Sequence, residues 1–72
     1  MGEIFKVLLD QIMAVRDSGL VNMLDTKGVQ RVADGMGFYD LVVFIEEQRA
    51  EYWRFIMDGD VRHLGAPSED IL

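Results

Sequence analysis

Two arginines and two aromatic residues lie close together in the second half of the chain and offer its best chemistry for ligand binding. They are Arg49, Tyr52, Trp53 and Arg54. A guanidinium can bind a phosphate through paired hydrogen bonds, while an aromatic ring stacks on a nucleobase. Two copies of this cluster across a two-fold axis would form a symmetric pocket for a small nucleotide. In the alternative interpretation, Arg49 forms a salt bridge with an acid of another helix or subunit, because it falls within an apolar stripe.

The acidic pairs are poor candidates for catalysis or metal binding. Glu46 and Glu47 are adjacent, and neighbouring side chains on a helix point about 100° apart, so these two do not converge. Asp58-Gly59-Asp60 lacks the run of oxygen ligands that a calcium loop requires. We interpret the first pair as solvated surface and the second as the end of a helix.

The single histidine and the lack of cysteine argue against an enzyme. His63 has no nucleophile or carboxylate at a suggestive spacing, and one histidine without thiolates cannot build a zinc site. The sequence has no phosphate-binding loop and no signature of a serine hydrolase or a zinc protease. We therefore expect no catalytic residue, no metal and no cofactor.

The charge of the chain disfavours nucleic acids and membranes as partners. The formal charge is −6, and residues 38–72 hold eight acids but only three bases. Phosphate backbones and anionic lipid surfaces repel such a protein. No apolar run is long enough to span a membrane, and the N-terminus does not resemble a secretory signal. We expect a cytosolic protein.

Helical periodicity predicts an all-α fold of three helices, over about residues 3–18, 26–36 and 38–57. Gly19 is the expected left-handed stop of the first helix, and Asp25 is the expected N-cap of the second, with Thr26 as the competing choice. Gly28 and Gly35 each weaken the second helix by about 1 kcal/mol relative to alanine. Residues 1–60 form the expected domain, and residues 61–72 form a tail that is either mobile or docked on a neighbouring subunit.

The third predicted helix is the most apolar part of the chain. Val42 to Ile45 would suit a buried strand, but good helix formers follow, and no other segment could pair with a lone strand. As one helix, the segment is apolar over more than half of its circumference, which predicts burial on more than one side. We expect a homo-oligomer, a dimer or larger, built on this helix. The expected interface residues are Phe38, Leu41, Phe44, Ile45, Phe55 and Ile56.

The corner between the second and third helices has the spacing of a DNA-binding helix-turn-helix unit, carried by Ala33, Gly37 and Val43. A recognition helix places arginine, lysine, asparagine or glutamine outward to contact bases. The outward positions would be Tyr39, Asp40, Leu41, Phe44, Ile45 and Gln48. Only Gln48 suits this role, so we interpret the corner as a packing feature.

The segment from Asn22 to Asp60 resembles a short domain of unknown function encoded in phages and prophages of Firmicutes and related gut bacteria. The resemblance covers about residues 8–60. It is carried by Asn22, Met23, Leu24, Asp25, Val29, Gln30, Gly37, Phe38, Tyr39, Phe44, Ile45, Glu46 and Glu47. The resemblance implies a phage accessory protein in a bacterial cytoplasm, and it implies no catalytic or binding residues.

Three functions remain open from the sequence. The leading expectation is a non-enzymatic accessory protein that binds a host protein, for instance to inhibit a defence factor. Its acidity suits a basic, nucleic-acid-binding surface on that factor. The second is a homo-oligomeric sponge that sequesters a small nucleotide signal through the arginine and aromatic cluster. The third is a helix-turn-helix DNA-binding regulator, which the negative charge disfavours.

Overall fold

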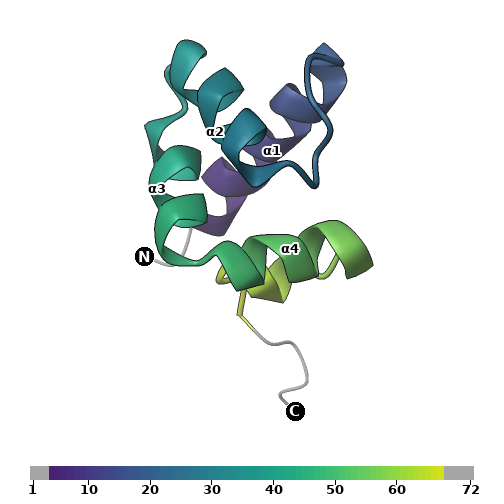
Figure 1. The fold of residues 1–72 in the computed structure, drawn as a ribbon. Helices are drawn as coiled ribbons and strands as arrows, with labels where there is room; N and C mark the ends of the chain where they lie inside the picture. The colour runs from purple at the N-terminus through teal and green to yellow at the C-terminus, as the bar shows by residue number, and fades with distance from the viewer. Residues whose placement is uncertain (1–3, 68–72) are drawn as a thin grey trace.

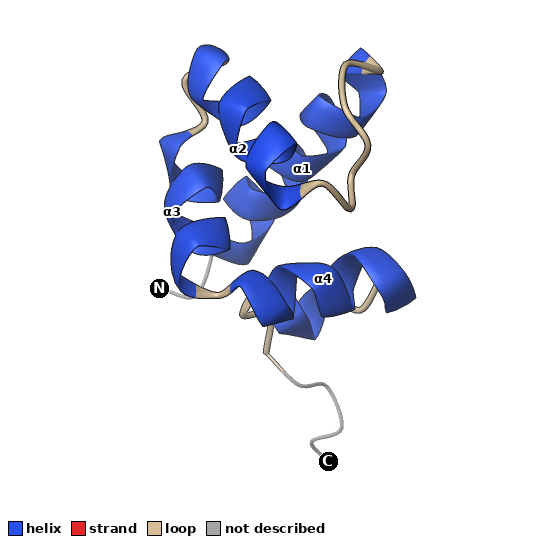
Figure 2. Cartoon of the chain, viewed as in Figure 1, coloured by secondary structure: helices blue, strands red, loops and turns tan. Residues whose placement is uncertain are grey.

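The computed structural model describes residues 4–67 and shows four α-helices and one short 3-10 helix in that range (Figure 1). The elements are α1 (Ile4–Ser18), α2 (Thr26–Gly35), α3 (Tyr39–Glu47), α4 (Arg49–Asp58) and the 3-10 helix η1 (Val61–Leu64). No strand occurs among the described residues, as Figure 2 shows. The expected all-α class is therefore confirmed.

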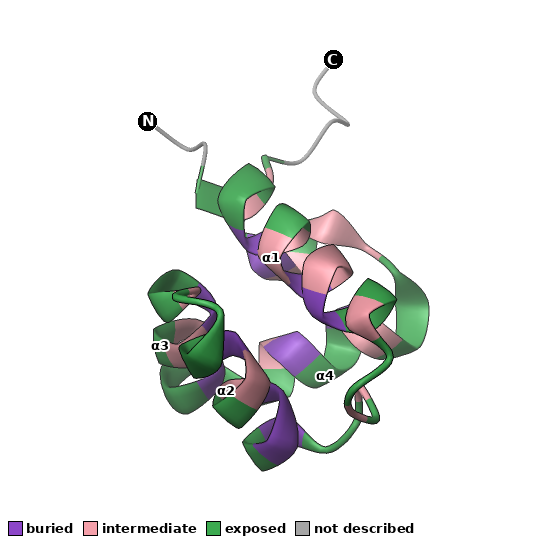
Figure 3. Cartoon of the chain, turned by 90° about the horizontal axis from the view of Figure 1, so that it is seen from above, coloured by how far each residue is buried: buried purple, intermediate pink, exposed green. Residues whose placement is uncertain are grey.

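The helices pack around one core to which every element contributes. Figure 1 shows α1, α2 and α3 grouped together, with α4 lying across one end of the group. The 3-10 helix η1 contacts both α4 and α1. The buried core residues are Leu8, Ile12, Val15, Val29, Ala33, Leu41, Ile45, Tyr52, Phe55 and Leu64. Figure 3 shows these buried positions forming stripes on the inner faces of the helices.

Local signals set the ends of α1 and α2 where the sequence places them. Gly19 adopts a left-handed φ of 68° directly after α1, and the Asp25 side chain accepts a hydrogen bond from the Gly28 backbone N at 3.1 Å. Beyond α2, Gly37 adopts a φ of 80°. The Phe38 backbone N then donates to the Ala33 carbonyl at 2.8 Å, which completes a Schellman stop. This turn makes the helix-turn-helix-like corner between α2 and α3.

Gly28 has a packing role that its low helix propensity conceals. A Cβ at this position would lie 2.6 Å from Asp25 Oδ2 and 2.7 Å from Val21 Cγ2. The first of these atoms belongs to the capping carboxylate of α2, so it cannot move away without loss of the cap. Around Gly35, in contrast, nothing lies within 4 Å of the added Cβ.

We therefore expect opposite results from the same substitution at the two glycines. Gly28→Ala should lower the free energy of unfolding by about 1–2 kcal/mol, because overpacking and cap damage outweigh the gain in helix propensity. Gly35→Ala should leave it unchanged or raise it by up to about 1 kcal/mol. Urea denaturation of both variants measures the difference, and a stabilised Gly28→Ala variant would contradict the packing role.

The single helix expected over residues 38–57 is wrong, because the chain breaks at Gln48. This residue has φ −133° and ψ 47° and separates α3 from α4. Residues 46–50 are all exposed, so water can satisfy the backbone groups that the break releases. A straight helix would carry Tyr52 and Phe55 away from the core. The change of direction lets α4 lie across the end of the other helices and bury both residues (Figure 1).

The fold places half of the expected oligomer-interface residues in the core of the single chain. The broad apolar circumference came from the apolar side chains of Tyr39, Val43, Trp53 and Met57, which are all exposed in the single chain rather than buried. Leu41, Ile45 and Phe55 are buried in the core of the single chain, so they are not available to a partner. Phe38, Phe44 and Ile56 are partly buried against the same core.

The residues expected to form a C-terminal tail begin with η1. The Asp60 side chain accepts a hydrogen bond from the Arg62 backbone N and so caps this turn. Leu64 follows with an exposed fraction of only 2%. The 3-10 helix η1 therefore packs against α1 and α4 and contributes Leu64 to the core. The last five residues of the expected tail, 68–72, lie outside the described residues.

Candidate functional site

A groove of about 620 Å³ lies between α1, α3, the start of α4 and η1. Its apolar lining consists of Ile4, Leu8, Val43, Phe44 and Leu64, and its ionisable lining consists of Asp40, Glu47, Glu51, Arg62 and His63. Ile4 and Val43 are both about half exposed, while Leu8 and Leu64 are buried beneath them. The groove thus offers accessible apolar surface on a packed floor.

A hydrogen bond between α1 and α3 holds the two main walls of the groove together. The Leu41 backbone N, in the first turn of α3, donates to the Gln11 side-chain oxygen of α1 at 3.0 Å. No side chain caps α3 at Phe38. The Leu41 amide also donates to the Phe38 carbonyl at 3.1 Å, so Gln11 provides a second acceptor for it. This contact ties the start of α3 to α1.

Two acids of α3, Asp40 and Glu47, line the groove, and no ion pair neutralises them among the described residues. Asp40 and Glu47 are exposed and are seven residues apart, so they lie on one face of the helix two turns from each other. Within residues 4–67, neither forms an ion pair or a side-chain hydrogen bond. Their charges are therefore available to a ligand.

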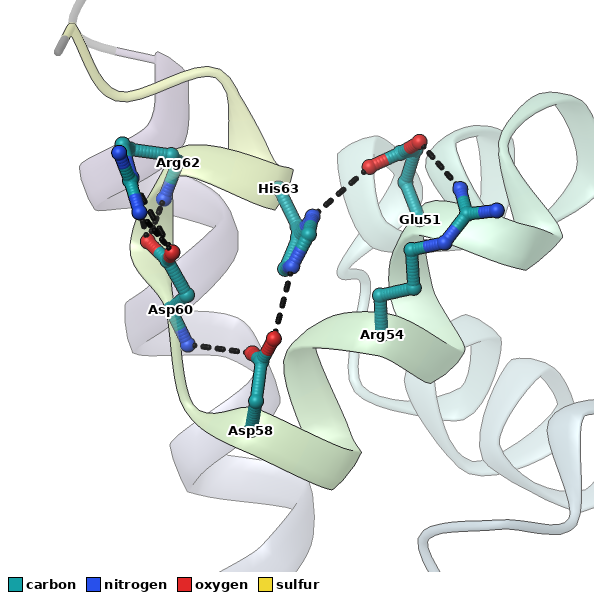
Figure 4. Close-up of polar contacts among 6 residues, drawn as sticks. All are labelled: Glu51, Arg54, Asp58, Asp60, Arg62 and His63. Carbon is teal, nitrogen blue, oxygen red and sulfur yellow. Dashed lines mark hydrogen bonds and ion pairs between the residues drawn. The ribbon is translucent and has the colours of Figure 1, made fainter.

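The cations of the groove are paired with acids of α4 and of the segment that follows it (Figure 4). His63 Nδ1 lies 3.0 Å from Glu51 Oε1, and His63 Nε2 lies 3.0 Å from Asp58 Oδ2. We call this arrangement the His63 clasp. Arg54 Nη1 donates to the other oxygen of Glu51 at 2.7 Å. The clasp joins η1 to α4 and so fixes one wall of the groove.

The electrostatics of the clasp favour a charged imidazolium. The hydrogen bonds with Asp58 and Glu51 raise the pKa of His63 above its usual value of 6.5. The hydrogen bond from the Asp60 backbone N, together with that from His63, lowers the pKa of Asp58. Because a carboxylate faces each ring nitrogen, neither nitrogen is free to take a proton from a substrate in this arrangement.

Arg62 is likewise neutralised by a neighbouring acid. Its Nη2 lies 2.6 Å from Asp60 Oδ2, and its Nε donates to the same carboxylate. The side-chain hydrogen bonds from Arg62, with that from the Arg62 backbone N, lower the pKa of Asp60 to about 2. With Arg62 and His63 both paired, the charge that remains available in the groove is negative.

The structure does not bring the predicted ligand cluster together. Tyr52 is fully buried, and its hydroxyl donates to the Met23 carbonyl at 2.7 Å. Arg49 is exposed rather than set in an apolar stripe. Trp53 is half exposed, and Arg54 is paired with Glu51. Tyr52 therefore serves the core and cannot stack on a nucleobase.

Sequence reasoning missed the residues that do converge. One helical face of α3 carries four of them at the spacing i, i+3, i+4, i+7, namely Asp40, Val43, Phe44 and Glu47. This spacing was overlooked because the predicted helix extended to residue 57. The carboxylate partners of His63 were also missed. Glu51 and Asp58 lie twelve and five residues before it, and only the turn between α4 and η1 brings them to the ring.

The exposed side chains of α3 do not suit DNA. The exposed residues of this helix are Tyr39, Asp40, Val43, Glu46 and Glu47. None is basic, and three are acids that would repel phosphates. The helix-turn-helix-like corner therefore presents an acidic and apolar surface where a reader of bases would carry cations and amides.

The His63 clasp should make stability fall as pH rises above the unfolded pKa of His63, 6.5. A raised pKa in the folded state means that the stabilisation is complete below the unfolded pKa of 6.5 and is lost as pH rises through the folded pKa. As pH rises from 6.5 through the raised folded pKa of His63, the wild-type free energy of unfolding should fall relative to that of His63→Gln. His63 is the only histidine, and the α-amino group contributes equally to both proteins. Parallel curves in urea denaturation would contradict the clasp.

A protein family matches the part of the chain that contains most of the residues lining the groove. A family described as a domain of unknown function (DUF5049) matches residues 4–60. No curated protein and no solved structure matches the chain. The match includes α1 and α3, and hence Asp40, Val43 and Glu47, whereas η1 lies beyond it. Among residues 4–67, none of the helices has both the length and the apolar character needed to cross a membrane.

Proposed function

Since the chain belongs to the family described as a domain of unknown function (DUF5049), we propose that it is a non-enzymatic accessory protein that binds a host protein through the groove. The single observation that carries this proposal is the combination of accessible apolar surface with two acids, Asp40 and Glu47, that form no ion pair within residues 4–67. The partner that fits is a protein with a basic surface, because complementary charge speeds association and excludes wrong partners.

The resemblance of the sequence to phage and prophage proteins supports a proposal about the organism and the compartment in which the protein acts. The chain would be encoded by a phage or prophage of a Firmicutes-like host and would act in the host cytoplasm. A basic surface on a host factor is commonly a nucleic-acid-binding surface. By covering such a surface, the acidic groove would inhibit a host defence protein.

The geometry favours this function over the two others expected from the sequence. The nucleotide sponge needs the cluster of Arg49, Tyr52, Trp53 and Arg54 to face one ligand. Tyr52 is instead buried and bonded to Met23, and Arg54 is paired with Glu51. The DNA-binding regulator needs cations on α3, but the charged residues exposed on this helix are all acids. No specific observation in the fold supports either of these two functions.

Site-specific photocrosslinking in the bacterial host tests the proposal. A photoreactive phenylalanine analogue at position 43, in the groove, should crosslink to one host protein that mass spectrometry can identify. The same analogue at position 17 is the matched control, since Asp17 is exposed at the other end of α1, about 20 Å from Ile4 along the helix. This control should not yield the adduct.

Two results would contradict the proposal. Equal crosslinking from positions 43 and 17 would mean that the groove does not select the partner. An adduct consisting only of two copies of the chain would mean that the groove is a self-association surface. Light scattering of the purified protein distinguishes that case, because a monomer at micromolar concentration is incompatible with it.

A further inference from the structure

We infer that the groove receives a basic amphipathic α-helix, which lies along α3 with two cations seven residues apart and an apolar pair between them. The inference deepens the proposed function by naming the form of the partner segment, and it rests on that function. Its basis is the arrangement of Asp40, Val43, Phe44 and Glu47 on one face of α3 beside Ile4 of α1.

The spacing of the two acids selects a helix rather than an extended peptide. Asp40 and Glu47 are two helical turns apart, or about 10.5 Å along α3. In an extended peptide this distance spans about three residues, and residues three apart point to opposite faces of a strand. On a partner helix, residues seven apart share a face and have the same separation. Two cations at this interval can therefore meet both acids at once.

The apolar part of the groove lies between the two acids. Val43 and Phe44 come from α3, and Ile4 comes from the facing wall on α1. A partner helix with cations at its first and eighth positions presents its fourth and fifth positions on the same face. Apolar residues at those two positions would cover the half-exposed side chains of Ile4 and Val43.

The chain itself is a poor occupant of its own groove. Its lysines and arginines are at positions 6, 16, 27, 31, 49, 54 and 62, and no two of them are seven residues apart. A second copy also carries a formal charge of −6, which repels the acidic groove. The last five residues, Ser-Glu-Asp-Ile-Leu, contain no base. Charge complementarity therefore favours a separate, basic partner.

A fluorescein-labelled synthetic peptide tests the inference directly. The probe is a helix-forming alanine and glutamine sequence with lysine at its first and eighth positions and leucine at its fourth and fifth. Fluorescence anisotropy should show binding to the full chain. Two control peptides, one with glutamate in place of lysine and one with serine in place of leucine, should bind much more weakly.

Matched variants of the protein locate the binding. Asp40→Asn with Glu47→Gln should weaken binding of the lysine peptide by about tenfold, as expected for the loss of two exposed ion pairs. Asp10→Asn with Asp34→Asn removes the same charge from exposed positions outside the groove lining and should have little effect. Asp40→Lys with Glu47→Lys should bind the glutamate peptide in preference to the lysine peptide. Circular dichroism confirms that each variant is folded.

The other outcomes overturn either the inference or the proposed function, and they distinguish the two. The groove variant (Asp40→Asn with Glu47→Gln) and the control variant (Asp10→Asn with Asp34→Asn) could bind the lysine peptide with equal affinity. That result would mean that the general negative charge of the protein, and not the groove, binds the peptide. Self-association of the chain that competes with the peptide would make a second copy the occupant. If no peptide binds but position 43 still crosslinks to a host protein, the helical partner is wrong and the proposed function stands. If the peptide binds but no crosslink forms in the host, the proposed function fails instead.

Discussion

Tyr52→Ala should destabilise the protein by about 3–5 kcal/mol, the usual cost of truncating a large buried aromatic side chain. Tyr52 has an exposed fraction of 0% and is the largest fully buried side chain among the described residues. Its hydroxyl donates to the Met23 carbonyl at 2.7 Å, so it ties α4 to the loop between α1 and α2. A 72-residue chain has little stability to spare, so the variant should be largely unfolded at room temperature.

Tyr52→Phe separates the hydrogen bond from the packing. It keeps the ring but leaves the Met23 carbonyl without this donor, which should cost about 1–3 kcal/mol. Burial raises the pKa of Tyr52 to about 12, so the phenol stays neutral and remains a donor at physiological pH. Trp53→Ala is the control, because this neighbouring aromatic side chain is half exposed. If urea denaturation gives similar losses for Tyr52→Ala and Trp53→Ala, the assignment of Tyr52 to the core is wrong.

Leu64→Ala should lower the free energy of unfolding by about 2–5 kcal/mol, the range for leucine truncation in a packed core. This residue lies beyond the domain expected from the sequence, yet its exposed fraction is only 2%. It packs with the core through the contacts of η1 with α1 and α4. Thermal and urea denaturation both measure the effect.

Leu20→Ala is the matched control for Leu64→Ala. It removes the same atoms from a side chain that is 70% exposed, so we expect a change of less than about 0.5 kcal/mol. A small effect at both positions would mean that η1 does not contribute to the core in solution. Because Leu64 also lines the groove, a destabilised Leu64→Ala variant links the fold of this segment to the integrity of the candidate site.

The sequence by itself determined the helical class, the first two helices and the corner after them. These features depend on neighbours along the chain. The apolar spacing of Leu8, Ile12 and Val15 makes one face of α1, and Asp25 caps α2 from three residues away. Gly37 ends α2 because a left-handed φ is least costly for glycine. Local interactions of this kind can be predicted from the sequence, because they join residues that are close together along the chain.

Only the tertiary structure decided where the third predicted helix breaks and which residues line the groove. Residues 46–50 are good helix formers, so local propensity favours continuation; the break instead lets Tyr52 and Phe55 reach a core made by other helices. The same packing places η1 beside α4 and brings His63 to its carboxylates. Burial and charge pairing between segments distant in sequence act through space. Periodicity within one segment therefore could not reveal them.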